Sequence, residues 1–191
     1  MPDYRRLFVP GGTYFFTVVT HERQPTFRRP AAIALIGSML RRCMMRWPMT
    51  VNAIVLLPDH WHTLWTLPRG DSEYPKRLGW IKKEFTKHWL SIGGEEHAVT
   101  EGKQRQRRHG VWQPRYWEHV VQDEDDFQNH FDYIHWNPVK HGRVRCPRDW
   151  PHSSFHRWVT QGVYSEHWGC YTEGIDRRPS TIKAVKEAGE P

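Results

Sequence analysis

Hydrophobic residues recur in patterns that predict four β-strands. Residues 13–20 are apolar on both alternating faces, which is typical of a strand in the middle of a sheet. Residues 51–57 are rich in β-branched side chains, and residues 60–67 alternate between two faces after a Pro-Asp turn, so we expect a strand and a returning strand. Residues 115–122 alternate in the same way and predict a fourth strand.

Three segments between and after these strands have the spacing of helices. Residues 31–47 and 74–90 repeat apolar side chains three or four positions apart. Residues 123–137 open with acidic residues, which favour a helix N-terminus, and we expect this helix to end before Pro138. The side chains expected to face the core are Ile33, Ile36, Leu40, Met44 and Trp47 in the first helix, Leu78, Ile81, Phe85 and Trp89 in the second, and Phe127, Phe131 and Ile134 in the third.

These elements follow one another in the order β-α-β-β-α-β, with one more helix at the end. The order predicts an α+β fold of the ferredoxin-like type, in which an antiparallel sheet carries helices on one face. In that topology the first and third strands, residues 13–20 and 60–67, are central. The length of 191 residues suits a single domain with room for a tail.

Composition narrows the functional classes without deciding between them. The chain carries a formal charge of +7 and 11 tryptophans, which suits nucleic acid because cations contact phosphates and rings stack on unpaired bases. Many basic proteins bind no nucleic acid, so this feature alone is weak evidence. No run approaches the roughly 18 apolar residues of a membrane span, and the N-terminus lacks the apolar stretch of a signal peptide. We therefore expect no membrane partner.

The three cysteines, Cys43, Cys146 and Cys170, lie far apart in the sequence and form no Cys-x-x-Cys pair. This spacing argues against a disulfide scaffold and against a zinc site built from cysteines. We therefore expect a protein of the reducing cytoplasm, in which thiols stay unpaired.

Two histidines, His60 and His62, open the third predicted strand within an apolar run. Side chains two apart on a strand point the same way, so both imidazoles share one face and Trp61 lies on the other. Most His-x-His pairs are polar residues of a half-exposed face or core histidines with backbone partners. Two buried imidazoles each need a partner, and a shared divalent metal satisfies both if another element supplies a third ligand.

The last predicted helix offers such a ligand. Tyr133 and Asn137 lie four apart on a flank about a quarter turn from the apolar stripe, with Asp126 and His130 along the same flank. We expect this flank to be half buried. Asn137 can offer its amide oxygen to a metal, and the Tyr133 hydroxyl would lie beside it. From this helix alone, a boundary tyrosine and a helix-end asparagine are the better interpretation.

Four stretches together resemble a known family. LPDHWH, VWQPRYWEHVVQDEDDF, DYIHWNPVKHG and DWPHSSFH occur in this order, within a likeness that spans residues 3–158. They resemble the single-tyrosine HUH transposases, and above all the branch of the REP-associated tyrosine transposases. The resemblance implies a ferredoxin-like catalytic domain over residues 1–158 and an accessory tail over residues 159–191. It also implies a metal-dependent enzyme that nicks and rejoins single-stranded DNA beside palindromic hairpins, with no small-molecule cofactor, as a monomer or a homodimer.

The resemblance further implies roles for individual residues. His60 and His62 would be the metal ligands, and Asn137 would be the third ligand, where some relatives have glutamine. Tyr133 would be the nucleophile, which attacks a phosphate and forms a 5′-phosphotyrosine. Oxygen and nitrogen ligands of this kind favour Mg²⁺ or Mn²⁺, although two imidazoles also accept zinc or nickel.

Proton transfer and DNA binding need further residues. A phenol is a weak acid, so Tyr133 needs help to lose its proton. His130 is the first candidate for this proton transfer and His119 is the second. Basic residues on a solvated helix face or in a loop are common without a ligand, but the expected substrate gives phosphate contact more weight. The expected DNA contacts are Arg5, Arg6, Lys82, Lys83, Lys87, Arg105, Arg107, Arg108 and Lys140.

Three other functions are compatible with the sequence. An inactive relative would hold a DNA or RNA hairpin and regulate it. A metallonuclease would use water as the nucleophile and leave no covalent protein–DNA adduct. A structural zinc domain is disfavoured by the missing cysteine ligands. Attachment of a labelled oligonucleotide to an identified residue would separate the first two from a tyrosine transposase.

Overall fold

The protein is described by a computed structural model that covers residues 7–99, 102, 109–171, 179–180 and 182. The predicted order of strands and helices is present, and the strand bounds differ from prediction by no more than two residues at either end. The elements are β1 (Thr13–Val19), α1 (Pro30–Arg46), β2 (Thr50–Leu56), β3 (His60–Thr66), α2 (Tyr74–Ser91), β4 (Trp117–Val120), α4 (Glu124–Lys140) and α5 (Phe155–Thr160).

The four strands form one antiparallel sheet in the order β2-β3-β1-β4. The first and third strands are therefore central, as predicted. The register sets Thr17 of β1 opposite His62 of β3 and Val19 opposite His60. Before β1, Gly11 adopts a φ of 73°, which glycine tolerates without strain, and donates its backbone N–H to the carbonyl oxygen of Asp71.

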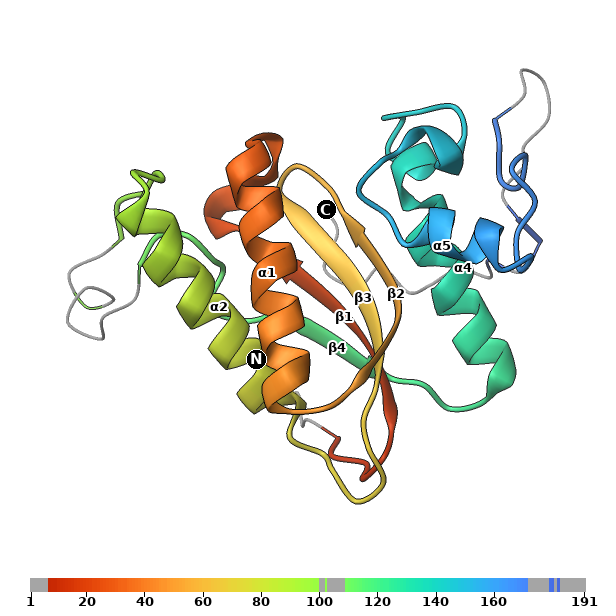
Figure 1. Cartoon of the computed structure of the whole chain (residues 1–191), viewed down its shortest axis with the longest axis horizontal. Coiled ribbons are helices and arrows are strands. Elements are labelled where there is room, and N and C mark those ends of the chain that lie inside the picture. The colour runs from red at the N-terminus through yellow and green to blue at the C-terminus, as the bar shows by residue number, and fades with distance from the viewer. Residues whose placement is uncertain (1–6, 100–101, 103–108, 172–178, 181, 183–191) are drawn as a thin grey trace.

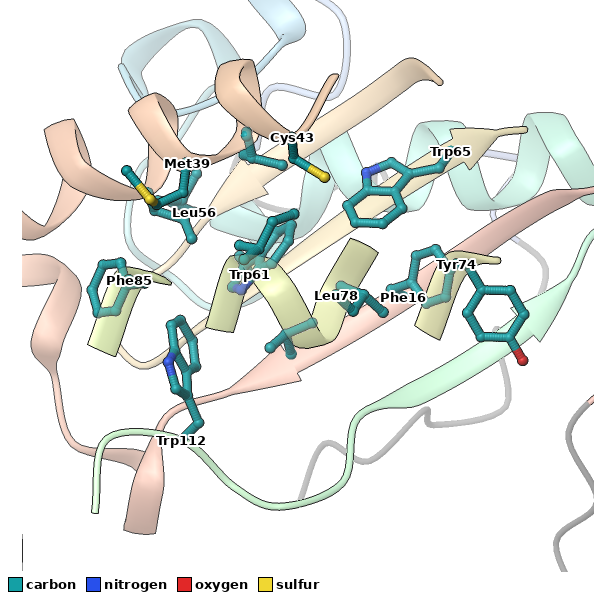
Figure 2. Close-up of a cluster of buried hydrophobic side chains, with 14 of the residues drawn as sticks. Phe16, Met39, Cys43, Leu56, Trp61, Trp65, Tyr74, Leu78, Phe85 and Trp112 are labelled. Atoms are coloured by element: carbon teal, nitrogen blue, oxygen red, sulfur yellow. The ribbon is translucent and has the colours of Figure 1, made fainter. Parts of the chain in front are cut away.

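Helices cover both faces of the sheet (Figure 1). α1 and α2 pack over one face, where Trp61, Trp65 and Phe16 contribute to a large aromatic core (Figure 2). α4 and α5 lie over the other face, where Phe15 and Leu64 pack with side chains of α4. The alternation of β3 thus sends its tryptophans to one layer and its histidines to the other, as predicted.

The buried face of α1 differs from the predicted one. Ile36 and Leu40 are buried, but Met44 is 36 % exposed, and Ala32 and Cys43 are buried instead. α1 packs beside α2 on the same face of the sheet, and Ala32 and Cys43 belong to the core that the two helices share. In α2 the predicted stripe is correct, because Leu78, Ile81, Phe85 and Trp89 are all buried.

The last long helix begins as predicted but ends later. Asp123 caps α4 by accepting a hydrogen bond of 2.8 Å from the backbone N–H of Asp126. The expected end before Pro138 is wrong, because α4 runs on to Lys140 with Pro138 buried inside it. A proline removes one backbone hydrogen bond of the helix, and burial of the apolar Pro138 ring opposes that loss. The extra turn carries Lys140 along the helix, two turns beyond Tyr133.

The C-terminal segment after α4 brings two cysteines together. Cys146 and Cys170 form a disulfide, so the expectation that the thiols stay unpaired is wrong for this pair, while Cys43 is free and buried. The two cysteines are 24 positions apart, a distance at which sequence alone indicates no pairing. Tyr164 of the same segment packs against Phe155 of α5. The division at residue 158 stays a prediction.

No helix in the described part of the chain is long and apolar enough to cross a membrane.

Candidate active site

His60 and His62 lie side by side on the sheet face that α4 covers. Both side chains are buried, and their ring centroids are 4.9 Å apart. Trp61 between them points to the opposite layer, where it is fully buried in the core of α1 and α2. The predicted shared face of the two imidazoles is therefore present in the structure.

Each imidazole is oriented through its Nδ1 atom. His60 donates from Nδ1 to Asp59 Oδ1 at 2.7 Å, and His62 Nδ1 shares a hydrogen bond of 2.9 Å with Thr17 Oγ1. A hydrogen bond at one ring nitrogen selects the other nitrogen as the metal ligand, so the two Nε2 atoms are the ones that would ligate an ion. Sequence reasoning missed both partners. The position of Asp59 directly before the histidine pair could have suggested its role. The role of Thr17 could not be foreseen, because its contact with His62 depends on the register between β1 and β3.

Asp59 is held as a carboxylate by two neighbours. Burial raises its pKa, but the hydrogen bonds and charges of His60 and Arg23 outweigh burial and lower the pKa to about 2. Arg23 Nη1 donates to Asp59 Oδ2 at 3.0 Å. The chain reaches this position through left-handed backbone at Glu22 and Arg23, with φ of 49° and 53°. Thr20 Oγ1 also donates to the Asp59 carbonyl at 2.7 Å.

Tyr133 faces the histidine pair from α4. Its ring centroid lies 5.5 Å from that of His62 and 6.0 Å from that of Phe15. The expectation of a half-buried flank is wrong, since Tyr133 is only 4 % exposed. The sheet covers one side of α4, and Tyr164 from the C-terminal segment packs on Phe131 at another, so a helix flank that would be half open in a two-layer domain is covered.

Lys140 contacts the phenol of Tyr133. Its Nζ atom donates to Tyr133 Oη at 3.1 Å and lies 4.9 Å from the centre of the ring. An ammonium group at this distance favours negative charge on the phenolic oxygen. The sequence suggested Lys140 only as a DNA contact, because a helix that ended before Pro138 would not have carried it to Tyr133.

Asn137 lies between two residues that contact the histidine pair. It is fully buried, one turn after Tyr133 and one turn before His141. The His141 ring lies 5.6 Å from the His60 ring, just as Tyr133 lies against His62. Residues four apart on a helix share a face, so Asn137 belongs to the face of α4 that looks toward the histidines. Its role as a ligand stays a prediction.

His119 and His130, the candidates for proton transfer, share one carboxylate. His119 donates from Nε2 to Asp126 Oδ2 at 2.7 Å, and His130 Nδ1 lies 3.0 Å from Asp126 Oδ1. Burial lowers the pKa of His130. One ligand atom from each of the three residues lies within 4.8 Å of the others, which makes this group a candidate metal site distinct from the histidine pair. Proton transfer by either histidine stays a prediction.

The lysines expected to contact DNA gather in one place. Lys82, Lys83 and Lys87 of α2 line a cavity of about 730 Å³ together with Trp112. Trp112 forms a backbone β-bridge with Thr20, and the Thr20 hydroxyl donates a hydrogen bond to the Asp59 carbonyl. The cavity therefore lies next to the turn that precedes His60. The remaining expected contacts, Arg5, Arg6, Arg105, Arg107 and Arg108, lie outside the described residues.

A histidine pair on a central strand that faces a tyrosine on a helix is the arrangement expected of a single-tyrosine transposase. A REP-associated tyrosine transposase of Escherichia coli K12 is 40 % identical over 172 residues, which cover 88 % of this chain and 91 % of that protein. A Haemophilus influenzae protein that provisionally bears the same name is 41 % identical over 169 residues, covering 88 % and 94 %. The chain belongs to the REP-associated tyrosine transposases, which are enzymes, so the family resemblance is confirmed.

A solved structure supports the same conclusion for the fold. A REP-associated tyrosine transposase bound to a REP hairpin matches with a TM-score of 0.74 at 36 % identity, covering 93 % of this chain and 98 % of that one. No family model matches the chain. The antiparallel sheet with its helices is therefore the fold of this family.

Proposed function

We propose that this transposase cleaves and rejoins single-stranded DNA beside a REP-type hairpin, with Tyr133 as the nucleophile. The observation that carries the proposal is the contact between the Tyr133 ring and the His62 ring across the α4–sheet interface, 5.5 Å between centroids. Polar groups are seldom buried without a role, and here a phenol and two imidazoles are buried together. The exposed Lys140 brings its ammonium group to the phenolic oxygen. The strand order β2-β3-β1-β4 supports assignment of the fold to the ferredoxin-like type.

The residues present fit a divalent metal ion. Two imidazoles with orienting partners at Nδ1 and the amide oxygen of Asn137 would hold the ion from one side. Phosphate and water oxygens would fill the remaining positions, which is why an oxygen-preferring ion such as Mn²⁺ or Mg²⁺ suits this site. A bound ion would withdraw charge from a non-bridging phosphate oxygen and make phosphorus more electrophilic. Asp59 and Thr17 would hold the two rings in place for this task, as second partners of metal-binding histidines do in general.

The protein side chains would handle the nucleophile and its proton. The Tyr133 oxygen attacks phosphorus, the bond from phosphorus to the 3′ oxygen breaks, and the products are a 5′-phosphotyrosine and a free 3′-hydroxyl. The phenolic proton passes to an acceptor, for which His130 and His119 are candidates, and a proton is returned to the leaving 3′ oxygen. Lys140 stabilises the phenolic oxygen while it carries charge. The reverse attack by a 3′-hydroxyl rejoins the strand without ATP.

Replacement of Lys140 tests this electrostatic role. We expect Lys140→Met to slow cleavage by about 100-fold, the typical effect of removing one group that stabilises developing charge. Lys140→Arg keeps the charge and should retain much more activity. The measurement is a single-turnover cleavage assay at saturating DNA, which separates the chemical step from binding. Equal rates for the methionine variant and the wild type would remove Lys140 from the mechanism.

The expected form of the substrate follows from the burial of Tyr133 between α4 and the sheet. A duplex is about 20 Å wide and cannot bring one phosphate to a buried tyrosine without melting, whereas a flexible strand can. The solved relative is described as bound to a REP hairpin, which supports a hairpin with a single-stranded flank as the substrate here. The lysines of α2 around the 730 Å³ cavity would hold phosphates of that strand.

The experiment that tests the proposal compares two forms of one sequence. A labelled hairpin with a single-stranded flank should form a denaturant-stable adduct with Mg²⁺ or Mn²⁺, and peptide mapping should find the label on Tyr133. The same step annealed to a complementary strand should give no adduct. Binding should weaken with salt at a log–log slope of roughly −0.7 per phosphate contacted. Equal cleavage of both forms without an adduct would indicate a metallonuclease that uses water.

A further inference from the structure

We propose that His119, Asp126 and His130 form a second metal site, which takes a zinc-like transition metal ion and joins β4 to the first turn of α4. His119 lies on β4, and the other two residues lie on α4. Their ligand atoms lie within 4.8 Å of one another. The site can be tested without DNA, because none of its three residues belongs to the histidine pair, Asn137 or Tyr133. His119 and His130 are also the candidates for proton transfer, and a ring nitrogen that ligates an ion is not available to accept a proton.

The carboxylate is already held between the two imidazoles. Asp126 Oδ2 accepts from His119 Nε2 at 2.7 Å, and Asp126 Oδ1 lies 3.0 Å from His130 Nδ1. Ligands around a tetrahedral zinc ion stand about 3.4 Å apart, given bonds of about 2.1 Å. The two histidine–carboxylate pairs therefore need to open by less than about 1 Å to admit the ion. The backbone N–H of Gln122 fixes Asp126 Oδ2 at 2.9 Å, so the carboxylate is oriented before any ion arrives.

The two imidazoles can turn toward an ion without breaking the core. Their rings are stacked, with centroids 4.6 Å apart and planes 19° from parallel, so at least one ring has to rotate for both nitrogens to point at one ion. The His119 side chain is 32 % exposed and is the one free to rotate. The Nδ1 atom of His130 donates to the Asp126 carbonyl at 2.8 Å, and that carbonyl keeps its helical backbone bond if Nδ1 ligates instead.

The donor set selects the class of ion. Two imidazoles and one carboxylate are the ligands of zinc, cobalt and nickel sites, whereas Mg²⁺ prefers oxygen ligands and retains water. Solvent at the exposed His119 edge can supply a fourth ligand. The Phe15 ring separates this cluster from the histidine pair, since its centroid lies 4.8 Å from His130 and 5.4 Å from His62. The two sites would therefore bind ions separately.

The consequence concerns the helix that carries Tyr133. β4 is an edge strand that pairs only with β1 in the described sheet, and it has four residues. An ion held by His119 and by two residues of α4 would tie this short strand to the helix, because metal binding to the folded state raises its stability. Tyr133 lies one turn beyond His130, so the same tie would fix the start of the helix that presents the nucleophile.

Cobalt titration of the tag-free protein tests the site. Co²⁺ gives visible absorption bands when bound by nitrogen and oxygen ligands, and it stands in for zinc. We expect the His60→Ala, His62→Ala double variant to bind one Co²⁺ ion tightly and to gain thermal stability with it. Adding His119→Gln to this variant should remove both the bands and the stabilisation. His156→Gln, at an exposed histidine of α5, is the matched control and should change neither.

A second measurement covers the case in which the double variant does not fold. Wild-type protein should bind two Co²⁺ ions and the single variant His119→Gln should bind one, as counted by equilibrium dialysis. The proposal fails if the folded double variant binds no Co²⁺, or if His119→Gln leaves the wild-type stoichiometry and the metal-dependent melting temperature unchanged.

Discussion

Tyr133→Phe should abolish the covalent protein–DNA adduct and slow strand cleavage by at least about 10³-fold, because no other group would replace the attacking oxygen. The variant removes one atom and keeps the ring that packs against His62 and Phe15. It also removes the hydrogen bond from Lys140, which costs about 1 kcal/mol of stability and should not unfold the protein. The measurement is single-turnover cleavage of a hairpin oligonucleotide labelled on the 5′ and 3′ sides of the scissile phosphate.

Tyr164→Phe is the matched control for this variant. Tyr164 is also buried against α4, and its hydroxyl bonds to Asp132 on a different side of the helix. Loss of that hydroxyl should affect stability but leave adduct formation intact. Hairpin binding should be equal in both variants and the wild type. Cleavage by Tyr133→Phe at the wild-type rate would exclude a tyrosine nucleophile, and wild-type protein that binds the hairpin but never cleaves it would indicate a regulator.

The part of the site that sequence could predict depends on short-range periodicity. The spacing of His60 and His62 places both on one face of a strand, and the spacing of Tyr133 and Asn137 places both on one helix face, because both periods are properties of the backbone. Which strand face meets which helix is a tertiary question. Only the family resemblance predicted that the histidine face of the strand meets the tyrosine face of the helix. The sequence of the helix alone favoured an ordinary boundary tyrosine.

The part that sequence could not predict depends on contacts between distant segments. Thr17 orients His62 only because β1 and β3 pair in one particular register, 45 positions apart in the chain. Arg23 reaches Asp59 through two residues of left-handed backbone, which no residue preference suggests for Glu22 and Arg23. Lys140 reaches Tyr133 because α4 continues past Pro138, against the usual effect of proline in a helix.

The fold shows the same division. Alternation identified β3 and β4, and short apolar runs, one of them rich in β-branched residues, identified β1 and β2. Both signals are local, because they depend only on neighbouring positions in the chain. The apolar stripe of α1 was less informative. Methionine and cysteine adapt to either a buried or an exposed position, so their spacing does not show which of them face the core. In the structure Ala32, Met39 and Cys43 are buried, and Met44 is exposed. The Cys146–Cys170 disulfide joins segments whose proximity depends on how the chain after α4 packs.

His60→Ala and His62→Ala should each abolish metal-dependent cleavage, because an ion left with one imidazole and an amide oxygen does not compete with water. Both side chains are buried and bonded to Asp59 and Thr17, so circular dichroism and hairpin binding have to confirm the fold first. DNA binding should largely survive, since phosphate and base contacts lie elsewhere. Mn²⁺ titration followed by electron paramagnetic resonance measures the loss of the ion directly, without relying on cleavage.

The two residues that hydrogen-bond to His60 and His62 should affect metal affinity to different extents. Asp59→Asn removes a carboxylate that Arg23 also holds, and we expect it to weaken Mn²⁺ affinity by about 10- to 100-fold, the usual range for a second partner of a metal ligand. Thr17→Val removes only a neutral hydroxyl from His62 and should have a smaller effect. Excess Mn²⁺ should restore cleavage in Asp59→Asn but not in His60→Ala. Normal Mn²⁺ affinity and cleavage in either histidine variant would show that the pair has a structural role. The proposed metal site beside Tyr133 would then be wrong.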